Sequence, residues 1–252
     1  MNKFEKRNNE QNTPESRKLK RWAKEITKKY NLEHPFDDEK LIVALGQLLF
    51  KIKDHIDSYD TIISDEASGR LPSLLIKKVI DKKRHQEGKT SIPLHFIAGG
   101  HQVDYREKSI SEFLEKNKNN FGKILIVTDL IATGISMRQL ATIFKSCGVN
   151  DFEIATVSLA NDPEEQALPL SENLTFFQKN NIPLIYGDVG KTGHYSFYRK
   201  NSQTGVEKDI LQREAFPSKS NTVSQNTINK IRGSIDILAE EFYQLIFGTN
   251  KK

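Results

Sequence analysis

The sequence is poor in cysteine, tryptophan and methionine, with one, one and two of these residues among 252. The single Cys147 cannot form a disulfide within the chain, which is typical of proteins of the reducing cytoplasm. One cysteine and six histidines provide no CxxC or HExxH spacing, so the sequence predicts no direct protein site for a metal ion. Cys147 falls near the end of a predicted helix, where we expect a buried apolar residue rather than a nucleophile.

Long apolar runs are also missing. No stretch of about 18 apolar residues occurs, so we expect no transmembrane helix and no membrane partner. Residues 1–15 lack the apolar centre of a signal peptide, so we expect a cytoplasmic location. Hydrophobic residues make up 37% of the chain and charged residues 28%, which predicts one domain with long solvated helices and polar additions.

Apolar strand patterns alternate with helical patterns along most of the chain. The predicted strands lie at residues 59–64, 92–98, 123–127, 152–159 and 182–186. This alternation predicts an α/β protein with a parallel sheet flanked by helices. In such proteins, ligands bind at the carboxyl ends of the strands.

The segment 123–147 carries the clearest chemical pattern. An apolar strand ends at Asp129, a turn of small residues follows, and a helix pattern comes next. A strand, turn and helix in this order place free backbone N–H groups at a positive helix end, where phosphate binds. Thr133 and Ser136 can add hydroxyl donors, and Gly134 allows the backbone to approach closely. Because Asp129 can accept hydrogen bonds from sugar hydroxyls, the pattern predicts a site for a phosphorylated ribose.

The motif ILIVTDLIATGIS at residues 124–136 resembles the phosphoribosyl pyrophosphate (PRPP) loop of the type I phosphoribosyltransferases, and is most similar to the purine members. The resemblance implies a type I phosphoribosyltransferase-like doubly wound fold, with about five parallel strands flanked by helices, a small C-terminal hood, and added N- and C-terminal helices. Thr128 stands where the family has the first of two acids, so only Asp129 keeps the carboxylate role. The residues implied to bind the 5′-phosphate and ribose are Thr128, Asp129, Ala132, Thr133, Gly134, Ile135 and Ser136.

An earlier turn follows the first predicted strand. In the family a loop at this place binds the pyrophosphate, and Arg70 would meet its oxygens with a guanidinium fork. The alternative is a structural turn with Arg70 in a surface salt bridge, and the order of the two motifs favours the first interpretation. The residues implied to bind pyrophosphate are Glu66, Ala67, Ser68, Gly69 and Arg70.

Residues 101–120 are polar, with a short predicted helix at 111–116. The family has a mobile lid between the corresponding strands, so the resemblance implies that Arg106 and Lys108 join Asp129 as catalytic residues by neutralising the leaving group. A charged surface loop followed by that helix explains the pattern almost as well.

The segment 190–209 combines turn residues with aromatic residues. In the family a variable hood recognises the base, often by stacking it on an aromatic ring. The resemblance therefore implies Tyr186 and Tyr195 as base-binding residues. A plain hairpin is an equal alternative.

Two amphipathic helices flank the predicted core. Residues 15–29 carry a net charge of +5, the same as the whole chain, opposite an apolar face. A nucleic-acid contact is one interpretation; the one we favour is a helix docked by its apolar face, with its lysines in water. The apolar stripe of residues 224–247 indicates core packing or a homodimer seam. The chain thus divides into an N-terminal arm with a helix (1–36), a phosphoribosyltransferase-like core (37–170), the last core strand and hood (171–221), and a C-terminal helix (222–252).

The leading hypothesis is transfer of 5-phosphoribosyl from PRPP to a nucleobase-like acceptor, with release of pyrophosphate. The resemblance implies Mg²⁺ as cofactor, held through PRPP oxygens rather than by direct protein ligands. The alternative is a non-catalytic protein that keeps the fold and senses PRPP or a nucleotide, or an effector in stress or defence that acts on nucleotides. The loss of an acid at Thr128 and the basic helix both favour this alternative.

Overall fold

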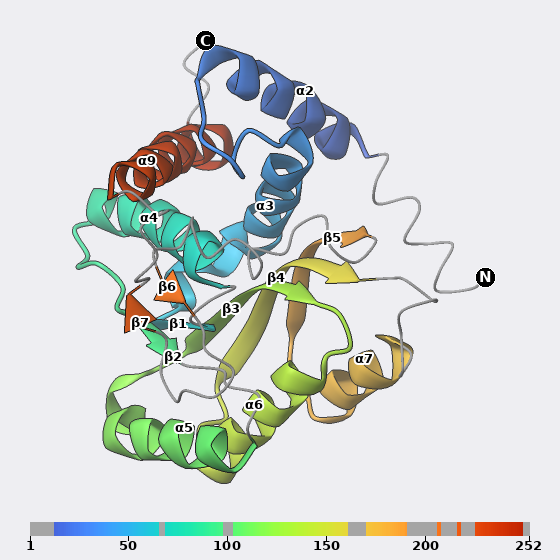
Figure 1. Ribbon diagram of the computed structural model, residues 1–252, viewed down its shortest axis with the longest axis vertical. Coiled ribbons are helices and arrows are strands. Elements are labelled where there is room, and N and C mark those ends of the chain that lie inside the picture. Colours follow the sequence, from blue (N-terminus) through green and yellow to red (C-terminus); the bar gives the residue numbers. More distant parts are fainter. Residues whose placement is uncertain are drawn as a thin grey trace.

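The computed structural model describes residues 13–65, 69–97, 103–160, 170–190, 206–207, 216–217 and 225–248. At its centre lies a sheet of five parallel strands in the order β2-β1-β3-β4-β5 (Figure 1). The predicted α/β fold, with a parallel sheet flanked by helices, is confirmed. The strands are β1 (Thr61–Asp65), β2 (Leu94–Ile97), β3 (Ile124–Ile131), β4 (Phe152–Ala160) and β5 (Leu184–Gly190).

Helices cover both faces of the sheet (Figure 1). One face carries α2 (Pro14–Lys29), α3 (Glu39–Ile52), α4 (Arg70–Gln86) and α9 (Gln225–Phe247). The other carries α5 (Val103–Asn117), α6 (Ile135–Ser146) and α7 (Leu170–Lys179). Two 3-10 helices, η1 (Lys53–Ser58) and η2 (Lys118–Asn120), precede β1 and β3. The short strands β6 (Val206–Glu207) and β7 (Phe216–Pro217) form a separate antiparallel pair.

Each face of the sheet has its own hydrophobic core. Leu125 and Val127 of β3 pack with residues of α3, α4 and α9. Ile124 and Ile126 of the same strand pack with residues of α5 and α6. Because both faces are buried, consecutive residues such as 124–127 are all apolar rather than alternating, as expected for a parallel sheet.

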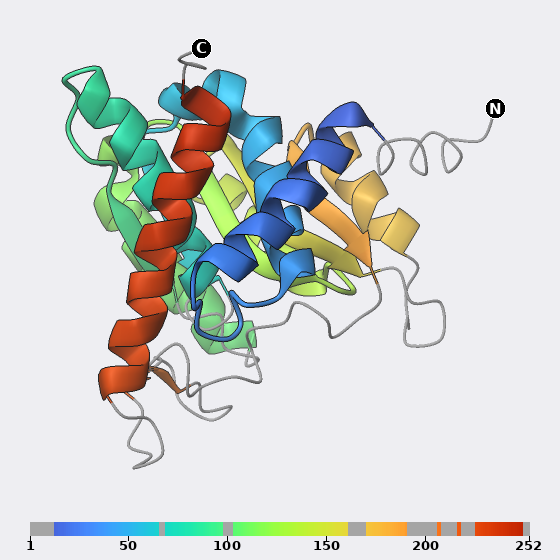
Figure 2. The same cartoon turned by 90° about the horizontal axis from the view of Figure 1, so that it is seen from above.

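The basic helix α2 docks by its apolar face, so the favoured interpretation of this segment is confirmed. Leu19, Ala23 and Ile26 are buried against the core. The rings of Trp22 and Phe242 lie 4.9 Å apart and join α2 to α9. Figure 2 shows α2 lying over α3 and beside α9.

The C-terminal helix α9 packs against the core through its apolar stripe, so core packing is confirmed for it, and the homodimer seam stays a prediction. Its buried apolar residues are Ile231, Ile235, Leu238, Ala239, Phe242 and Tyr243. Among the described helices, none has both the length and the apolar character needed to cross a membrane.

Predicted boundaries near the candidate site are wrong in two places. Strand β3 does not stop before residue 128 but continues to Ile131, because Leu130 and Ile131 pair with β4. Helix α5 begins at Val103 rather than at residue 111, so Arg106 and Lys108 lie in a helix and not in a loop. In β3, pairing with β4 extends the strand through polar residues that locally resemble a loop. Tyr195, a predicted base-binding residue, lies outside the described residues.

A polar cluster joins the amino ends of β1, β3 and β4. Glu153 accepts hydrogen bonds from Tyr59 Oη at 2.5 Å and from Lys123 Nζ, which lies 2.7 Å away. Burial acts to raise the pKa of Glu153, but these hydrogen bonds outweigh it and hold that pKa below its ordinary value. The pKa of Tyr59 is raised, mainly by burial of its hydroxyl and secondly by its hydrogen bond to Glu153. This cluster lies at the edge of the sheet opposite to the strands' carboxyl ends.

Helix α3 crosses β5 at Gly187, where only a glycine fits. A Cβ atom at this position would lie 2.0 Å from the Ala44 carbonyl oxygen of α3 and 2.7 Å from the Val157 carbonyl oxygen of β4. This close approach fixes the height of α3 above the sheet.

Candidate functional site

The strand order reverses between β1 and β3. From β1 the chain moves outward to β2 and then returns to β3 on the other side of β1. In doubly wound sheets of this order, ligands bind outside the carboxyl ends of the strands at the reversal. Helices α4 and α6 both begin at this edge, at Arg70 and Ile135. Two positive helix ends therefore face one place, which we call the switch point.

The carboxyl end of β3 is paired on one side only within the described part of the chain. Strand β1 pairs with β3 as far as Ser64 opposite Val127. Beyond Val127, the residues Thr128, Leu130 and Ile131 pair with β4. On the side of β3 that faces β1, the backbone after Val127 is therefore not paired with β1 and borders the switch point.

The turn after β3 has the geometry of an anion site. Gly134 takes a left-handed conformation, with φ of 76°, and caps α6 without a side-chain hydrogen bond. The Ile135 amide lies 3.4 Å from Thr133 Oγ1, and the Arg138 amide donates to the Gly134 carbonyl oxygen at 2.9 Å. Four predicted residues, Thr133 to Ser136, therefore form the turn and the first turn of α6, where backbone N–H groups point back towards the switch point.

Asp129 lies within β3, three residues before the turn begins at Ala132. The residue is only 2% exposed, and its Oδ1 accepts a hydrogen bond from the Leu130 amide at 2.6 Å. This contact fixes the carboxylate at the end of the strand, because a buried carboxylate is costly without hydrogen bonds.

Thr156 of β4 donates a hydrogen bond to the backbone carbonyl group of Asp129, a role that the sequence pattern does not predict. Its Oγ1 lies 3.2 Å from the Asp129 carbonyl oxygen and 2.9 Å from the Ser158 carbonyl oxygen. The only signal in the sequence is a pair of hydroxyl residues, 156 and 158, in an otherwise apolar strand.

Thr128 comes directly before Asp129 in β3 and pairs with Thr156 of β4. Thr128 is 2% exposed. The residue that stands where the resembled motif has its first acid is therefore a buried, uncharged side chain.

Gly69 and Arg70 bring the second predicted loop to the switch point. Gly69 caps α4, and Arg70 is its first residue. The Arg70 guanidinium carbon lies 4.2 Å from the ring centroid of Phe96 on β2, a cation–π contact that orients the side chain. Nothing in the sequence pattern indicated Phe96, because this contact joins two strand–helix units. Residues 66–68 of the predicted loop lie outside the described residues.

The structure places the remaining described candidates on α5 and β5. Lys108 is on α5, with a side chain 76% exposed and Nζ 3.9 Å from Glu112. Arg106 belongs to the same helix. Tyr186 is on β5, two strands from β3, where Lys51 Nζ lies 4.2 Å from its ring centroid. The roles of Arg106, Lys108 and Tyr186 stay predictions.

The described residues contain no group of three or more His, Cys, Asp or Glu side chains able to hold a metal ion. A Mg²⁺ ion that binds through phosphate oxygens keeps several waters and needs only one or two carboxylates. The carboxylate of Asp129 at the switch point is a donor of that kind, so the residues present fit an ion carried by a phosphorylated ligand.

No protein-family model matches the sequence, and no curated protein matches it. Among solved structures, the chain is similar to a purine phosphoribosyltransferase from Pyrococcus horikoshii. The two are 17% identical, the match covers 51% of this chain and 77% of that one, and the TM-score is 0.32. A likeness at this level does not identify the function, which has to be argued from the site.

Proposed function

We propose that the chain binds PRPP at the switch point and transfers its 5-phosphoribosyl group to a nucleobase-like acceptor, with release of pyrophosphate. One observation carries this proposal: the Gly134 turn and the Asp129 carboxylate lie together where the strand order reverses. In PRPP a phosphate and a ribose are neighbouring groups, and the turn and the carboxylate would bind one group each. The resemblance of residues 124–136 to a PRPP loop supports the same ligand.

Each part of PRPP has a counterpart in the described residues. The N–H groups of the first turn of α6 and the hydroxyls of Thr133 and Ser136 bind the 5′-phosphate. Asp129 accepts hydrogen bonds from ribose hydroxyls. Arg70, at the start of α4, binds the pyrophosphate oxygens. A Mg²⁺ ion carried by PRPP would supply further positive charge beside the pyrophosphate, next to Arg70.

Catalysis in this proposal needs no covalent nucleophile. Transfer of a ribosyl group builds positive charge on the sugar, so the protein contributes position and fixed charge. Asp129 provides negative charge beside the ribose, and Arg70 provides positive charge beside the leaving group. These two side chains come from the two strand–helix units that meet at the switch point.

A second candidate is a sensor that binds PRPP or a nucleotide without turning it over. The observation that favours it is Thr128, which is buried and carries no charge where the resembled motif has an acid. The segment then offers a single carboxylate to the sugar.

One experiment separates the two candidates. Pyrophosphate release is measured with saturating PRPP, Mg²⁺ and a panel of nucleobases, and PRPP binding is measured by calorimetry in parallel. Release with any base establishes a transferase, whereas saturable binding without release establishes a sensor. If PRPP does not bind at all, the transferase and the PRPP sensor are both wrong, and a sensor of another nucleotide is tested by the same calorimetry with nucleoside mono-, di- and triphosphates.

A further inference from the structure

The solvent face of α2 carries a straight stripe of basic side chains. Arg17, Arg21, Lys24 and Lys28 stand at spacings of four, three and four residues, which places them on one face of the helix. All four are exposed. At a rise of about 1.5 Å per residue, the stripe is about 16 Å long. We call these four residues the α2 stripe.

The α2 stripe lies on the side of the helix away from the core. Leu19, Ala23 and Ile26 occupy the buried face. Seen from above in Figure 2, α2 is on the outer surface, and no other described element lies over it. Lys18 and Lys20 flank the stripe and are also exposed. The docking of α2 thus uses one face and leaves the basic face open.

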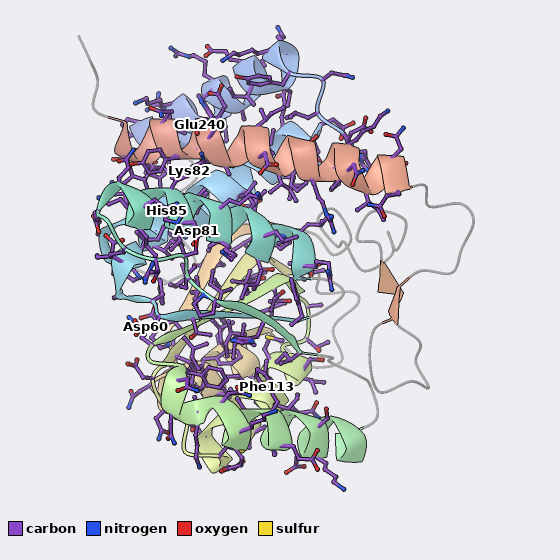
Figure 3. The ribbon with its side chains drawn as sticks, turned by 90° about the vertical axis from the view of Figure 1, so that its left-hand side faces the viewer. Asp60, Asp81, Lys82, His85, Phe113 and Glu240 are labelled. Carbon is purple, nitrogen blue, oxygen red and sulfur yellow. The ribbon has the colours of Figure 1, made fainter. Side chains whose placement is uncertain are left out.

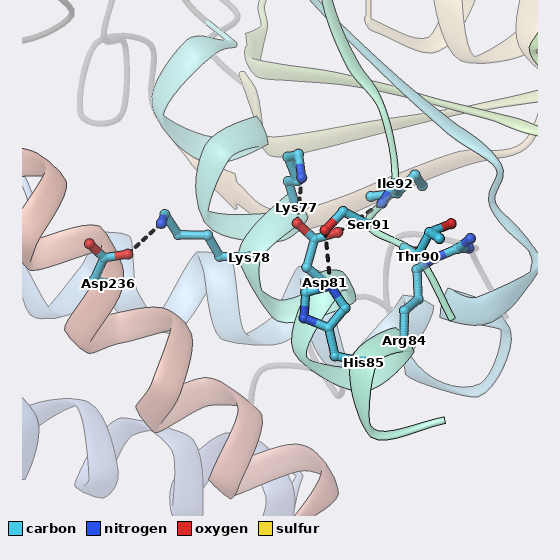
Figure 4. Close-up of polar contacts among 9 residues, drawn as sticks. All are labelled: Lys77, Lys78, Asp81, Arg84, His85, Thr90, Ser91, Ile92 and Asp236. Carbon is cyan, nitrogen blue, oxygen red and sulfur yellow. Dashed lines mark hydrogen bonds and ion pairs between the residues drawn. The ribbon is translucent and has the colours of Figure 1, made fainter. Parts of the chain in front are cut away.

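Three lysines of α2 and α4 form ion pairs with acids of α9. On α4, Lys78 Nζ lies 2.5 Å from Asp236 of α9 (Figure 4), and Lys82 Nζ lies 2.6 Å from Glu240 (Figure 3). At the edge of α2 itself, Lys29 pairs with Glu241 at 2.8 Å.

The α2 stripe differs from these lysines. Within the described part of the chain, none of its four side chains forms an ion pair. Since the segment 15–29 has the same net charge as the whole protein, +5, the rest of the chain is neutral in sum. The segment that forms α2 therefore carries as much net positive charge as the whole chain.

The buried face of α2 decides what kind of anion fits. A helix that binds a membrane surface inserts its apolar face between lipids, but here Leu19 and Ile26 are 2% and 3% exposed. Trp22 packs on Phe242, so it is not presented for stacking on a base. The exposed face of α2 therefore offers a row of cations without an exposed aromatic or apolar partner for a base or a lipid. Such a row matches the repeated phosphates of a nucleic acid backbone.

We propose that the α2 stripe binds the phosphate backbone of a nucleic acid without sequence preference. The docked helix and the nucleic-acid contact, which the sequence presented as alternatives, use opposite faces and are compatible. This inference does not rest on the function proposed for the switch point, because α2 contributes no residue to that site.

The test measures binding of the full chain to a fluorescein-labelled 20-base-pair DNA duplex of arbitrary sequence by fluorescence anisotropy, at several salt concentrations. Each phosphate contact contributes about −0.9 to the slope of log K against log salt. Four contacts give a slope of about −3.6, so binding weakens about 150-fold between 50 and 200 mM salt. A second duplex of unrelated sequence should bind equally well.

Two double variants with the same change of charge provide the comparison. Arg21→Gln/Lys24→Gln removes two stripe cations and should make the slope shallower by about 1.8. Lys78→Gln/Lys82→Gln removes two cations of the α4–α9 seam and should leave the slope unchanged. Arg21→Lys/Lys24→Arg keeps the charges and should bind like the natural chain, with thermal unfolding measured for all variants.

Three outcomes would overturn the proposal. They are no duplex binding at 50 mM salt, equal losses in the two Gln variants, and binding to vesicles of anionic lipid without binding to the duplex. Equal losses would show an effect of net charge alone, and vesicle binding would assign the surface to a membrane.

Discussion

Replacing Asp129 with asparagine removes one charge from the switch point and little else. The Asn side chain keeps a carbonyl oxygen that can accept the hydrogen bond from the Leu130 amide, which Asp129 Oδ1 accepts at 2.6 Å. Folding should therefore be nearly unchanged. What is lost is a charged acceptor for ribose hydroxyls, and hydrogen bonds to charged groups contribute about 1.5–3 kcal/mol. The Kd for PRPP should rise about ten- to 150-fold.

Asp188 provides a matched control. Its Oδ1 accepts a hydrogen bond from the next backbone amide, that of Val189, at 2.7 Å, as Asp129 does from Leu130. It lies on β5, two strands from β3, which corresponds to about 10 Å and is beyond hydrogen-bond reach of a ribose on Asp129. Asp188→Asn should leave PRPP affinity within twofold.

The assay is isothermal calorimetry with PRPP in the presence of Mg²⁺, with thermal unfolding as the check on folding. If Asp129→Asn binds PRPP as tightly as the natural chain, Asp129 does not hold the ribose. If Asp129→Asn and Asp188→Asn weaken binding equally, the effect is one of general charge, and the reasoning from the switch point fails.

Three further predictions test other parts of the structure. Arg70→Ala should weaken binding of PRPP and pyrophosphate by about 1.5–3 kcal/mol but leave the binding of a nucleoside monophosphate unaffected in the same calorimetric assay. Equal losses for all three ligands would show that Arg70 supports the structure and does not bind pyrophosphate. Glu153→Gln should lower the free energy of unfolding by about 1–3 kcal/mol at neutral pH. Because the pKa of Glu153 in the folded protein lies below its ordinary value of 4.5, this difference in unfolding free energy should hold above pH 4.5 and shrink as the pH falls through the folded pKa. Urea unfolding from pH 3 to 7 measures it. A difference that is constant over this range would show that the charge of Glu153 does not stabilise the fold. Gly187→Ala should destabilise by about 3 kcal/mol, since its Cβ would clash with α3, whereas Gly233→Ala, in open space on α9, should stabilise by about 0.5–1 kcal/mol; similar thermal unfolding of the two variants would contradict the close approach of α3.

The sequence was enough to predict the parallel sheet and the turn after β3. Both rest on local patterns: continuous apolar runs such as residues 124–127, and a glycine at the start of a helix pattern. Gly134 adopts the left-handed conformation that such a turn needs. Local patterns also predicted the apolar face by which α2 docks.

The parts that the sequence could not provide depend on contacts between distant segments. Strand β3 continues past Asp129 because β4 pairs with it, and β4 begins more than twenty residues later. The position of Thr156 beside the Asp129 carbonyl oxygen follows from the same pairing. The contact of Arg70 with Phe96 depends on β1 and β2 lying side by side, which requires the strand order. Strand order is a property of the assembled sheet, and no local pattern encodes it.

The most direct measurement of the central claim is a crystal structure of the chain with PRPP and Mg²⁺. The account predicts the 5′-phosphate within hydrogen-bond distance of the backbone amides at Gly134, Ile135 and Ser136. It also predicts a ribose hydroxyl on the Asp129 carboxylate and the pyrophosphate beside Arg70. PRPP bound anywhere other than between the ends of β1 and β3, or bound there with its 5′-phosphate away from the α6 turn, would contradict it.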